Sequence, residues 1–147
     1  MKNKKIIIPS ILTIIMLVIL YFVNESQTGQ KAFDMGILTL MFILPITYLL
    51  MGMIIQSSNT NLKYVYILIS AISTVIFGYL WGEDLNILYA IICILPTFVG
   101  MTIYEIIKTI KQCIAAKKDH SKKERIDIDK IPIITTIILI FIYIVFI

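Results

Sequence analysis

Residues 6–23 read IIIPSILTIIMLVILYFV, an uncharged run that follows a cluster of three lysines, Lys2, Lys4 and Lys5. An α-helix rises about 1.5 Å per residue, so about 20 apolar residues cross a hydrocarbon core of about 30 Å. The run is longer than the apolar stretch of about 7–15 residues in a cleaved signal peptide, and no small-residue cleavage pattern follows it. We therefore expect residues 6–23 to be retained as a transmembrane helix.

Four further apolar runs follow along the chain. We expect them to form membrane spans at about residues 35–55, 64–81, 85–107 and 131–147. The last run is the shortest, and at about 25 Å of helix it is slightly shorter than the core is thick. Asp129 is a suitable N-cap before it, and Pro132 fits its first turn, where a missing N–H costs nothing. This run either crosses the bilayer fully, which we favour, or enters it without crossing.

The composition agrees with lipid as the solvent of these runs. Of the 147 residues, 59% are hydrophobic and 15% are charged, and the mean hydropathy is +0.95. Soluble domains are typically about 45–50% apolar and about 25% charged. The sequence therefore predicts an all-α integral membrane protein, a polytopic bundle of about five transmembrane helices in a single membrane domain, residues 1–147. The abundance of Ile, Lys and Asn is typical of an AT-rich bacterial genome.

The positions of the lysines predict the orientation. Lys and Arg accumulate in short loops on the cytoplasmic side of a membrane. With the N-terminus inside, the five spans leave Lys31 as the one basic residue of 13 that falls outside. The acidic residues of the outer connections are Glu25, Asp34, Glu83 and Asp84. We therefore expect a multi-pass protein of the cell (cytoplasmic) membrane, with its N-terminus in the cytoplasm and its C-terminus outside.

Small residues recur at helical spacing in the third and fourth spans. Inside lipid, close helix packing depends on small side chains that let two backbones approach. The two rows are Ser70, Thr74, Gly78 and Gly82, and Ala90, Cys93, Thr97 and Gly100. We expect these rows to form a helix-packing seam that joins the third and fourth spans as a hairpin. The alternative is that they form the seam of a homodimer.

The second and fourth spans share the tripeptide Ile-Leu-Pro. It places Pro45 and Pro96 near the middle of their spans. Each proline removes an intrahelical hydrogen bond, so we expect a kink in both helices. The shared tripeptide leaves open whether the first four spans are a two-helix unit repeated in parallel.

Residues 108–130 are predicted to be a cytoplasmic basic loop. Its basic surface consists of Lys108, Lys111, Lys117, Lys118, Lys122, Lys123 and Arg125. The isoleucine spacing over 103–114 indicates that the fourth helix continues into it and lays an amphipathic turn or two on the inner leaflet. Glu105, an acid at the membrane interface, can pair there with Lys108. The loop is either a topology signal and solvated connector, or a docking surface for anionic lipids or an acidic protein partner. It has no aromatic residue, so nucleic acid is not an expected partner.

Catalytic chemistry is not expected from the residues within the spans. His120, the one histidine, lies in the basic loop, so no Ser–His pair or histidine-ligated metal site can form in the membrane. No span carries a charged residue near its middle, which argues against charge-coupled transport by one copy. We expect no catalytic, metal-binding or cofactor-binding residues, and we do not expect an enzyme.

These features favour a small bacterial membrane protein of the accessory type. An immunity, regulatory or transporter-subunit role fits a chain that acts through helix–helix and loop contacts with a protein partner. One alternative is a homo-oligomeric channel or facilitator with its path between copies. A second alternative is a membrane enzyme of an unrecognised kind.

Overall fold

The computed structural model describes residues 4–58, 62–80, 88–118 and 128–146, and every element within these residues is helical. The elements are α1 (Lys4–Glu25), α2 (Gln30–Leu38), the π-helical turn η1 (Thr39–Ile43), α3 (Leu44–Gln56), α4 (Lys63–Leu80), α5 (Leu88–Lys118) and α6 (Lys130–Phe146). The predicted all-helical architecture is confirmed for these residues.

Among the described residues, four stretches are long and apolar enough to cross a membrane. They are Ile6–Glu25, Gln30–Gln56, Lys63–Leu80 and Tyr89–Ala115. The fifth predicted span also forms a helix, α6, but its apolar part over Lys130–Ile142 is shorter than the other four. The length and composition of four helices therefore suit a membrane, and a fifth crossing stays a prediction.

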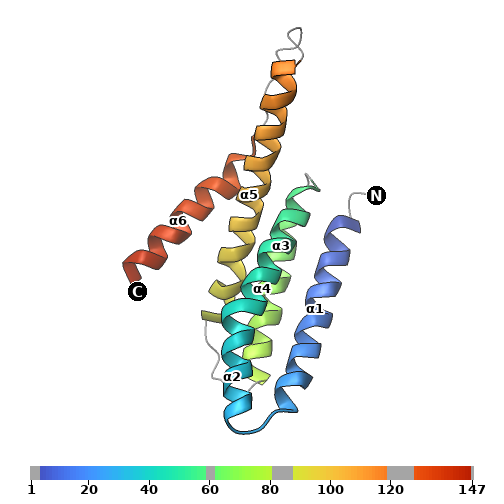
Figure 1. The fold of residues 1–147 in the computed structure, drawn as a ribbon, viewed down its shortest axis with the longest axis vertical. Coiled ribbons are helices and arrows are strands. Elements are labelled where there is room, and N and C mark those ends of the chain that lie inside the picture. The colour runs from blue at the N-terminus through green and yellow to red at the C-terminus, as the bar shows by residue number, and fades with distance from the viewer. Residues whose placement is uncertain (1–3, 59–61, 81–87, 119–127, 147) are drawn as a thin grey trace.

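The helices α1 to α5 lie side by side along the long axis of the molecule, whereas α6 leaves the side of α5 at an angle (Figure 1). The start of α1, the end of α3, the start of α4 and the end of α5 lie toward one end, which we call the N-terminal end. The end of α1 and the start of α2 lie at the opposite end. Helices α3 and α4 connect directly in sequence and run antiparallel.

Two boundaries differ from those predicted. The second span begins at Gln30 rather than at about residue 35. The predicted continuation of the fourth helix into the segment 108–130 is confirmed, and it extends as far as Lys118 because α5 runs without a break for 31 residues. The isoleucine spacing that favours a helix extends past the length that a membrane crossing would need. The connection of the predicted hairpin between the third and fourth spans lies outside the described residues.

Pro45 follows a π-helical turn. The Leu44 N–H donates to the carbonyl oxygen of Thr39, five residues earlier, rather than to the residue four before it. A proline ring collides with the carbonyl four residues before it in a regular helix, and a wider turn accommodates the ring. Pro96 lies inside α5, which remains α-helical on both sides of it. A π turn is a recognised cause of helix bending, so the prediction of a kink at Pro45 has a structural basis there.

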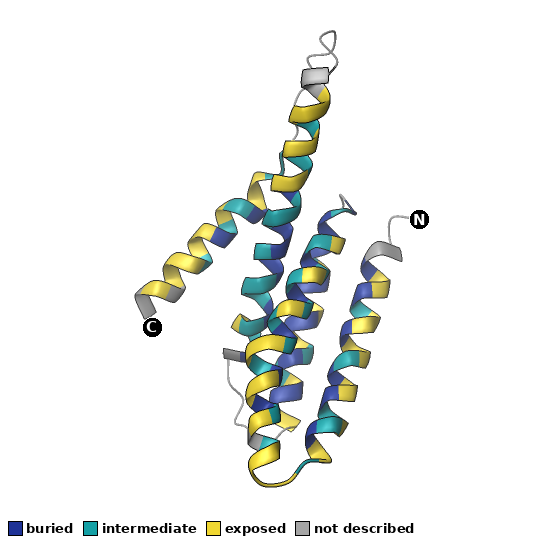
Figure 2. Ribbon diagram, viewed as in Figure 1, coloured by how far each residue is buried: buried dark blue, intermediate teal, exposed yellow. Residues whose placement is uncertain are grey.

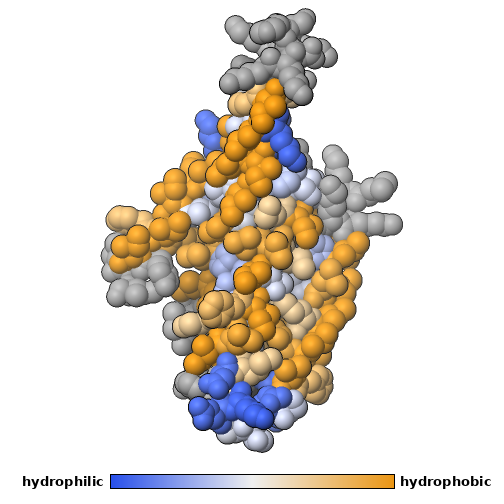
Figure 3. Space-filling model, viewed as in Figure 1, coloured by the Kyte–Doolittle hydropathy of each residue, from blue (hydrophilic) through white to orange (hydrophobic). Residues whose placement is uncertain are grey.

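The buried apolar side chains form two clusters along the bundle. One consists of Ile6, Ile55, Tyr66, Ile67, Phe98 and Met101, and the other of Leu17, Leu20, Leu44, Tyr48, Phe77 and Cys93. The outer faces of the helices are exposed and are also apolar, with Ile7, Met41 and Ile72 each more than half exposed. Exposed faces run along the full length of the helices (Figure 2), and hydrophobic residues dominate the surface between the two ends (Figure 3). This distribution suits a molecule surrounded by lipid.

The backbones of α3 and α5 approach each other closely. A Cβ atom built on Gly52 would lie 2.2 Å from the carbonyl oxygen of Thr97, and one on Gly100 would lie 2.0 Å from the carbonyl oxygen of Leu49. Only glycine fits at such distances, because every other residue carries a Cβ atom. The sequence favoured α4 as the tightest neighbour of α5. In the structure Gly100 faces α3 instead. Helix α3 carries Gly52, so each of the two helices has a glycine where the backbone of the other comes close.

Candidate functional site

A cluster of charged and amide side chains lies at the N-terminal end of the bundle. It consists of Gln56 at the end of α3, Lys63 at the start of α4, Glu105 in α5 and Asp129 directly before α6. We call these four residues the charge cluster. Gln56, Lys63 and Glu105 are each no more than 3% exposed, and the Asp129 side chain is 24% exposed. Four segments of the chain thus meet at these polar groups. Of the four side chains, only that of Asp129 is partly exposed.

The Gln56 amide is the centre of the cluster. Its Nε2 donates to Glu105 Oε1 at 2.7 Å and to Asp129 Oδ2 at 3.2 Å. Its Oε1 accepts a hydrogen bond from Lys63 Nζ at 3.1 Å. An amide has donors at one atom and an acceptor at the other, so it can join an ammonium group to two carboxylates. Gln56 therefore connects α4, α5 and the start of α6 at one point.

Lys63 and Asp129 form an ion pair as well, with Lys63 Nζ donating to Asp129 Oδ2. The Asp129 side chain also accepts the Ile131 N–H at 3.1 Å through Oδ1, which is the N-cap interaction predicted for α6. The Asp129 backbone N–H donates to Glu105 Oε2 at 3.4 Å. The start of α6 is therefore held to α4 and α5 by both the side chain and the backbone of Asp129.

Glu105 pairs with Lys108 as the sequence predicted, with 3.6 Å between Lys108 Nζ and Glu105 Oε2. Its carboxylate lies inside the protein, however, rather than at an exposed interface, because Glu105 is 2% exposed. Two cations, Lys63 and Lys108, thus face two carboxylates, Glu105 and Asp129. A buried charge without a partner is strongly unfavourable, and this balance offsets much of the cost of burial.

The surroundings of Asp129 favour its ionised form. Partial burial raises the pKa of its carboxyl, but hydrogen bonds from Lys63, Gln56 and the Ile131 N–H lower it, and the net pKa lies below the ordinary value. Hydrogen bonds and a nearby cation both stabilise a carboxylate more than a carboxylic acid. Asp129 therefore carries its negative charge toward Lys63 at neutral pH.

Hydroxyl groups join the helices nearer the middle of the bundle. Thr13 of α1 and Tyr66 of α4 lie 3.0 Å apart between their hydroxyl oxygens, and Tyr48 of α3 is hydrogen-bonded to Thr74 of α4. Thr102 of α5 and Thr136 of α6 are joined in the same way at 2.9 Å. Such bonds contribute about 0.6 kcal/mol each on average within membranes. They fix which helix faces meet, and they occupy polar groups that a membrane interior would otherwise leave unpaired.

The predicted seam residues are divided among several contacts. Ser70, Thr74, Cys93 and Thr97 are buried, and the Thr74 and Thr97 hydroxyls also donate to the backbone of Ser70 and Cys93 in their own helices. A Cβ atom on Gly78 would lie 2.7 Å from the Tyr89 ring, so this part of the seam does join α4 to α5. Ala90 is partly buried, Gly100 packs on α3, and Gly82 lies outside the described residues.

The predicted basic surface is described only in part. Lys111 is exposed, and Lys108 is partly buried beside Glu105. Lys117 and Lys118 belong to the last turn of α5, and their side chains lie outside the described residues. Lys122, Lys123, Arg125 and His120 also lie outside them.

Sequence reasoning missed three members of the charge cluster. It used Lys63 only to predict orientation and Asp129 only as an N-cap, and it gave Gln56 no role. The sequence did contain a sign that these residues meet. Each of them borders a predicted span, and all three borders lie on the predicted cytoplasmic side. Within the part of the chain that the structure describes, no group of three or more His, Cys, Asp or Glu side chains could hold a metal ion.

No family model, curated protein or solved structure matches this chain.

Proposed function

We propose that this chain is a non-enzymatic accessory protein of the cell membrane that binds a protein partner through the projecting end of α5. The observation that carries this proposal is the length of α5. Its 31 residues make about 46 Å of helix, about ten residues more than a hydrocarbon core of about 30 Å requires. Figure 1 shows this end of α5 extending past the ends of α1, α3 and α4.

The projecting part, residues 106–118, carries isoleucines that no other helix covers fully. Ile106, Ile110 and Ile114 are each half exposed or more, at spacings of four residues that place them on one face. Exposed isoleucine is unfavourable in water, at roughly 25 cal/mol for each Å² of apolar surface. A row of this kind is typical of a helix that binds in the apolar groove of a partner.

The charge of the projecting part indicates the chemistry of the partner. Lys111 lies beside the isoleucine row, and Lys117 and Lys118 end the helix. A partner with an apolar groove and an acidic rim would match both features. The unbroken helix through Lys118 favours an upright projection over the inner-leaflet position that the sequence suggested. The positive-inside rule places this end in the cytoplasm.

The paired polar groups of the bundle favour a structural role over a catalytic or conducting one. The Thr13 and Tyr66 hydroxyls are hydrogen-bonded to each other, as are those of Tyr48 and Thr74. Lys108 balances the one negative charge that remains in the charge cluster. Groups that are already paired are poorly suited to a polar path through one copy. They instead make the helices a rigid support for the end of α5.

Site-specific photocross-linking in native membranes tests this proposal. A photoreactive residue in place of Ile110 or Ile114 should form a discrete adduct with another protein. The matched control is Ile72 on the outer face of α4, which has a similar exposed fraction and should contact lipid alone. Adducts at Ile110 and Ile114 with lipid only would refute a docking role. A ladder of adducts with further copies of this chain would favour the homo-oligomeric alternative instead.

A further inference from the structure

The carboxylate of Asp129 is held by donors that belong to other helices. Lys63 Nζ of α4 and Gln56 Nε2 of α3 both donate to the same oxygen atom, Asp129 Oδ2. Each donor also has a bond to a residue of the bundle other than Asp129. Lys63 Nζ donates to Gln56 Oε1 at 3.1 Å, and Gln56 Nε2 donates to Glu105 Oε1 at 2.7 Å. The bundle therefore presents two positioned donors for one carboxylate.

The charges around these donors leave one positive charge for Asp129 to balance. Without Asp129, two cations, Lys63 and Lys108, face one carboxylate, that of Glu105. Lys63 is 3% exposed, and an ammonium group without a partner in such a place is strongly unfavourable. The site therefore favours an anion whenever Asp129 leaves it.

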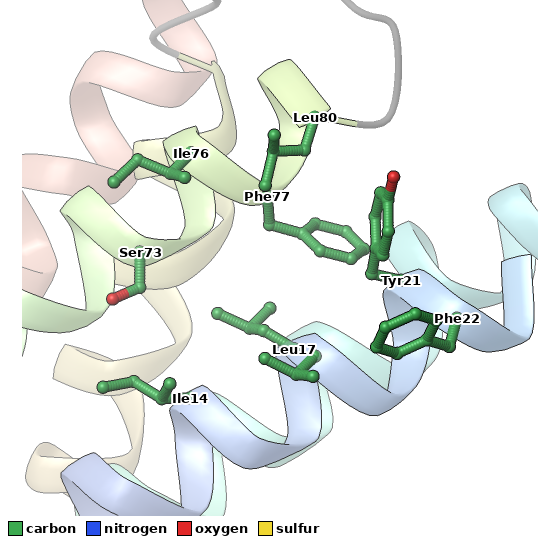
Figure 4. A pocket seen from close by; sticks show the side chains of 9 residues that line it. Ile14, Leu17, Tyr21, Phe22, Ser73, Ile76, Phe77 and Leu80 are labelled. Carbon is green, nitrogen blue, oxygen red and sulfur yellow. The ribbon is translucent and has the colours of Figure 1, made fainter. Parts of the chain in front are cut away.

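The apolar hollow between α1 and α4 offers no comparable selectivity. In that hollow Leu17 and Tyr21 from α1 and Phe77 from α4 point toward one another (Figure 4). None of its nine lining residues is charged. The hollow can distinguish ligands by shape alone, whereas the site of Asp129 selects for negative charge.

Asp129 is the part of this site that another molecule can reach. Its side chain is 24% exposed, whereas Gln56, Lys63 and Glu105 are each no more than 3% exposed. Glu105, which accepts the Asp129 N–H at 3.4 Å, directly precedes Ile106, where the projecting part of α5 begins. A helix is about 10 Å wide, so the acidic rim of a partner docked on the isoleucine row would lie about one helix width from Asp129.

The contacts near its start fix the direction of α6. Besides Asp129, the Thr136 hydroxyl bonds to α5, and Leu139 packs against the buried cluster that contains Met101. Farther along, Phe141 and Ile144 are 67% and 70% exposed. Figure 1 shows α6 leaving the side of α5 at an angle. A change at Asp129 therefore acts on the end of α6 that determines where the rest of the helix lies.

We propose that Lys63 and Gln56 form a carboxylate-binding site that Asp129 fills in the free protein, and that an acidic side chain of the docked partner takes its place. The exchange frees the start of α6 from α3 and α4, so partner binding at α5 changes the direction of α6. Asp129 is tethered to the site, so free anions compete with it poorly, whereas a docked partner is tethered as well. The site itself stands on the geometry of the charge cluster, and only the exchange rests on the proposed function.

Chemical rescue by acetate tests the carboxylate site in the purified full chain, without any partner. Asp129→Ala removes the carboxylate and leaves space for acetate beside Lys63. Acetate should raise the thermal midpoint of Asp129→Ala in a saturable way, with half of the effect at roughly 10–100 mM, the range that charge-assisted hydrogen bonds give. Sodium chloride at equal concentration controls for ionic strength. Wild type should respond equally to the two salts, because its site is filled.

The matched control is the double variant Lys63→Met/Asp129→Ala, which lacks the ammonium group and should show no acetate-specific rescue. Should Asp129→Ala be recovered poorly, the yield of folded protein at each acetate concentration gives the same comparison. Equal effects of acetate and chloride on Asp129→Ala would overturn the site. So would a rescue that persists in the double variant.

The effect on α6 is measured as the distance between spin labels on Ile72→Cys in α4 and Ile140→Cys in α6, with the exposed Cys113 replaced by Ser. Wild type should give one narrow distribution of distances. Asp129→Ala should broaden it about twofold, because a helix end with few contacts takes several positions. Acetate should not narrow it again, since bound acetate is not tethered to α6.

A distribution in Asp129→Ala as narrow as that of wild type would overturn the control of α6 by this site. The spin-label and acetate experiments need no partner, so they separate the two proposals. Photocross-linking at Ile110 and Ile114 that yields lipid adducts alone would refute the docked partner and the exchange, and a positive acetate rescue would still establish the site.

Discussion

Asp129→Asn and Lys63→Met remove opposite halves of one ion pair, and the structure predicts that they differ in cost. Both variants keep side chains of similar size. Lys63 is 3% exposed, whereas the Asp129 side chain is 24% exposed. The charge that remains after each substitution therefore lies in a different environment, and this environment decides the loss of stability.

In Asp129→Asn, the ammonium of Lys63 stays buried and keeps a hydrogen bond to Gln56 Oε1. An uncompensated buried charge costs about 3–5 kcal/mol, and the partial exposure of Asp129 reduces this, so we expect a loss of about 2–3 kcal/mol. In Lys63→Met, the carboxylate of Asp129 keeps water and the bonds from Gln56 and the Ile131 N–H. The expected loss there is about 1 kcal/mol.

The double variant measures the pair itself. With both charges gone, no ammonium is left uncompensated, so the two losses should not add. The expected coupling is about 1–2 kcal/mol. The free energy of unfolding is measured at pH 7 by steric trapping or by denaturing detergent in mixed micelles, with Lys31→Met as an exposed control. If Lys63→Met proves as costly as Asp129→Asn, the predicted asymmetry is wrong. If the double variant is additive within about 0.5 kcal/mol, the two charges do not stabilise each other.

Three further outcomes are expected. Gly52→Ala places a methyl group 2.2 Å from the Thr97 carbonyl oxygen, so α3 and α5 must separate, at a cost of about 2–3 kcal/mol in an unfolding titration. The pKa of Asp129 lies below its ordinary value of about 3.9, so the stability that its charge contributes is fully present above that pH and is lost as the pH falls further. Below about pH 4, wild type should therefore lose more stability than Asp129→Asn does. A reporter fused after Lys118 should be active in the cytoplasm, and an exported reporter there would contradict the orientation.

The sequence alone determined that there are helices along each apolar run, and for two of them it also determined the ends. The predicted spans 6–23 and 64–81 correspond to α1 at Lys4–Glu25 and α4 at Lys63–Leu80, so each boundary lies within two residues. This information is local, because a helix satisfies its own backbone hydrogen bonds and an apolar run of sufficient length needs no partner to do so. The Asp129 N-cap and the Glu105–Lys108 pair were predictable for the same reason, since their partners lie two and three residues apart.

The tertiary structure alone decided which helices touch and which polar residues meet. Gly100 packs on Leu49 of α3, although the sequence favoured α4, because a close approach depends on a matching glycine in another helix. Gln56 and Asp129 are 73 residues apart and still share a hydrogen bond. Each stands at the end of its own apolar run, and only the stacking of four segments brings them together. Helix positions follow from the residues of one run, whereas contacts between runs depend on how the helices are turned toward one another.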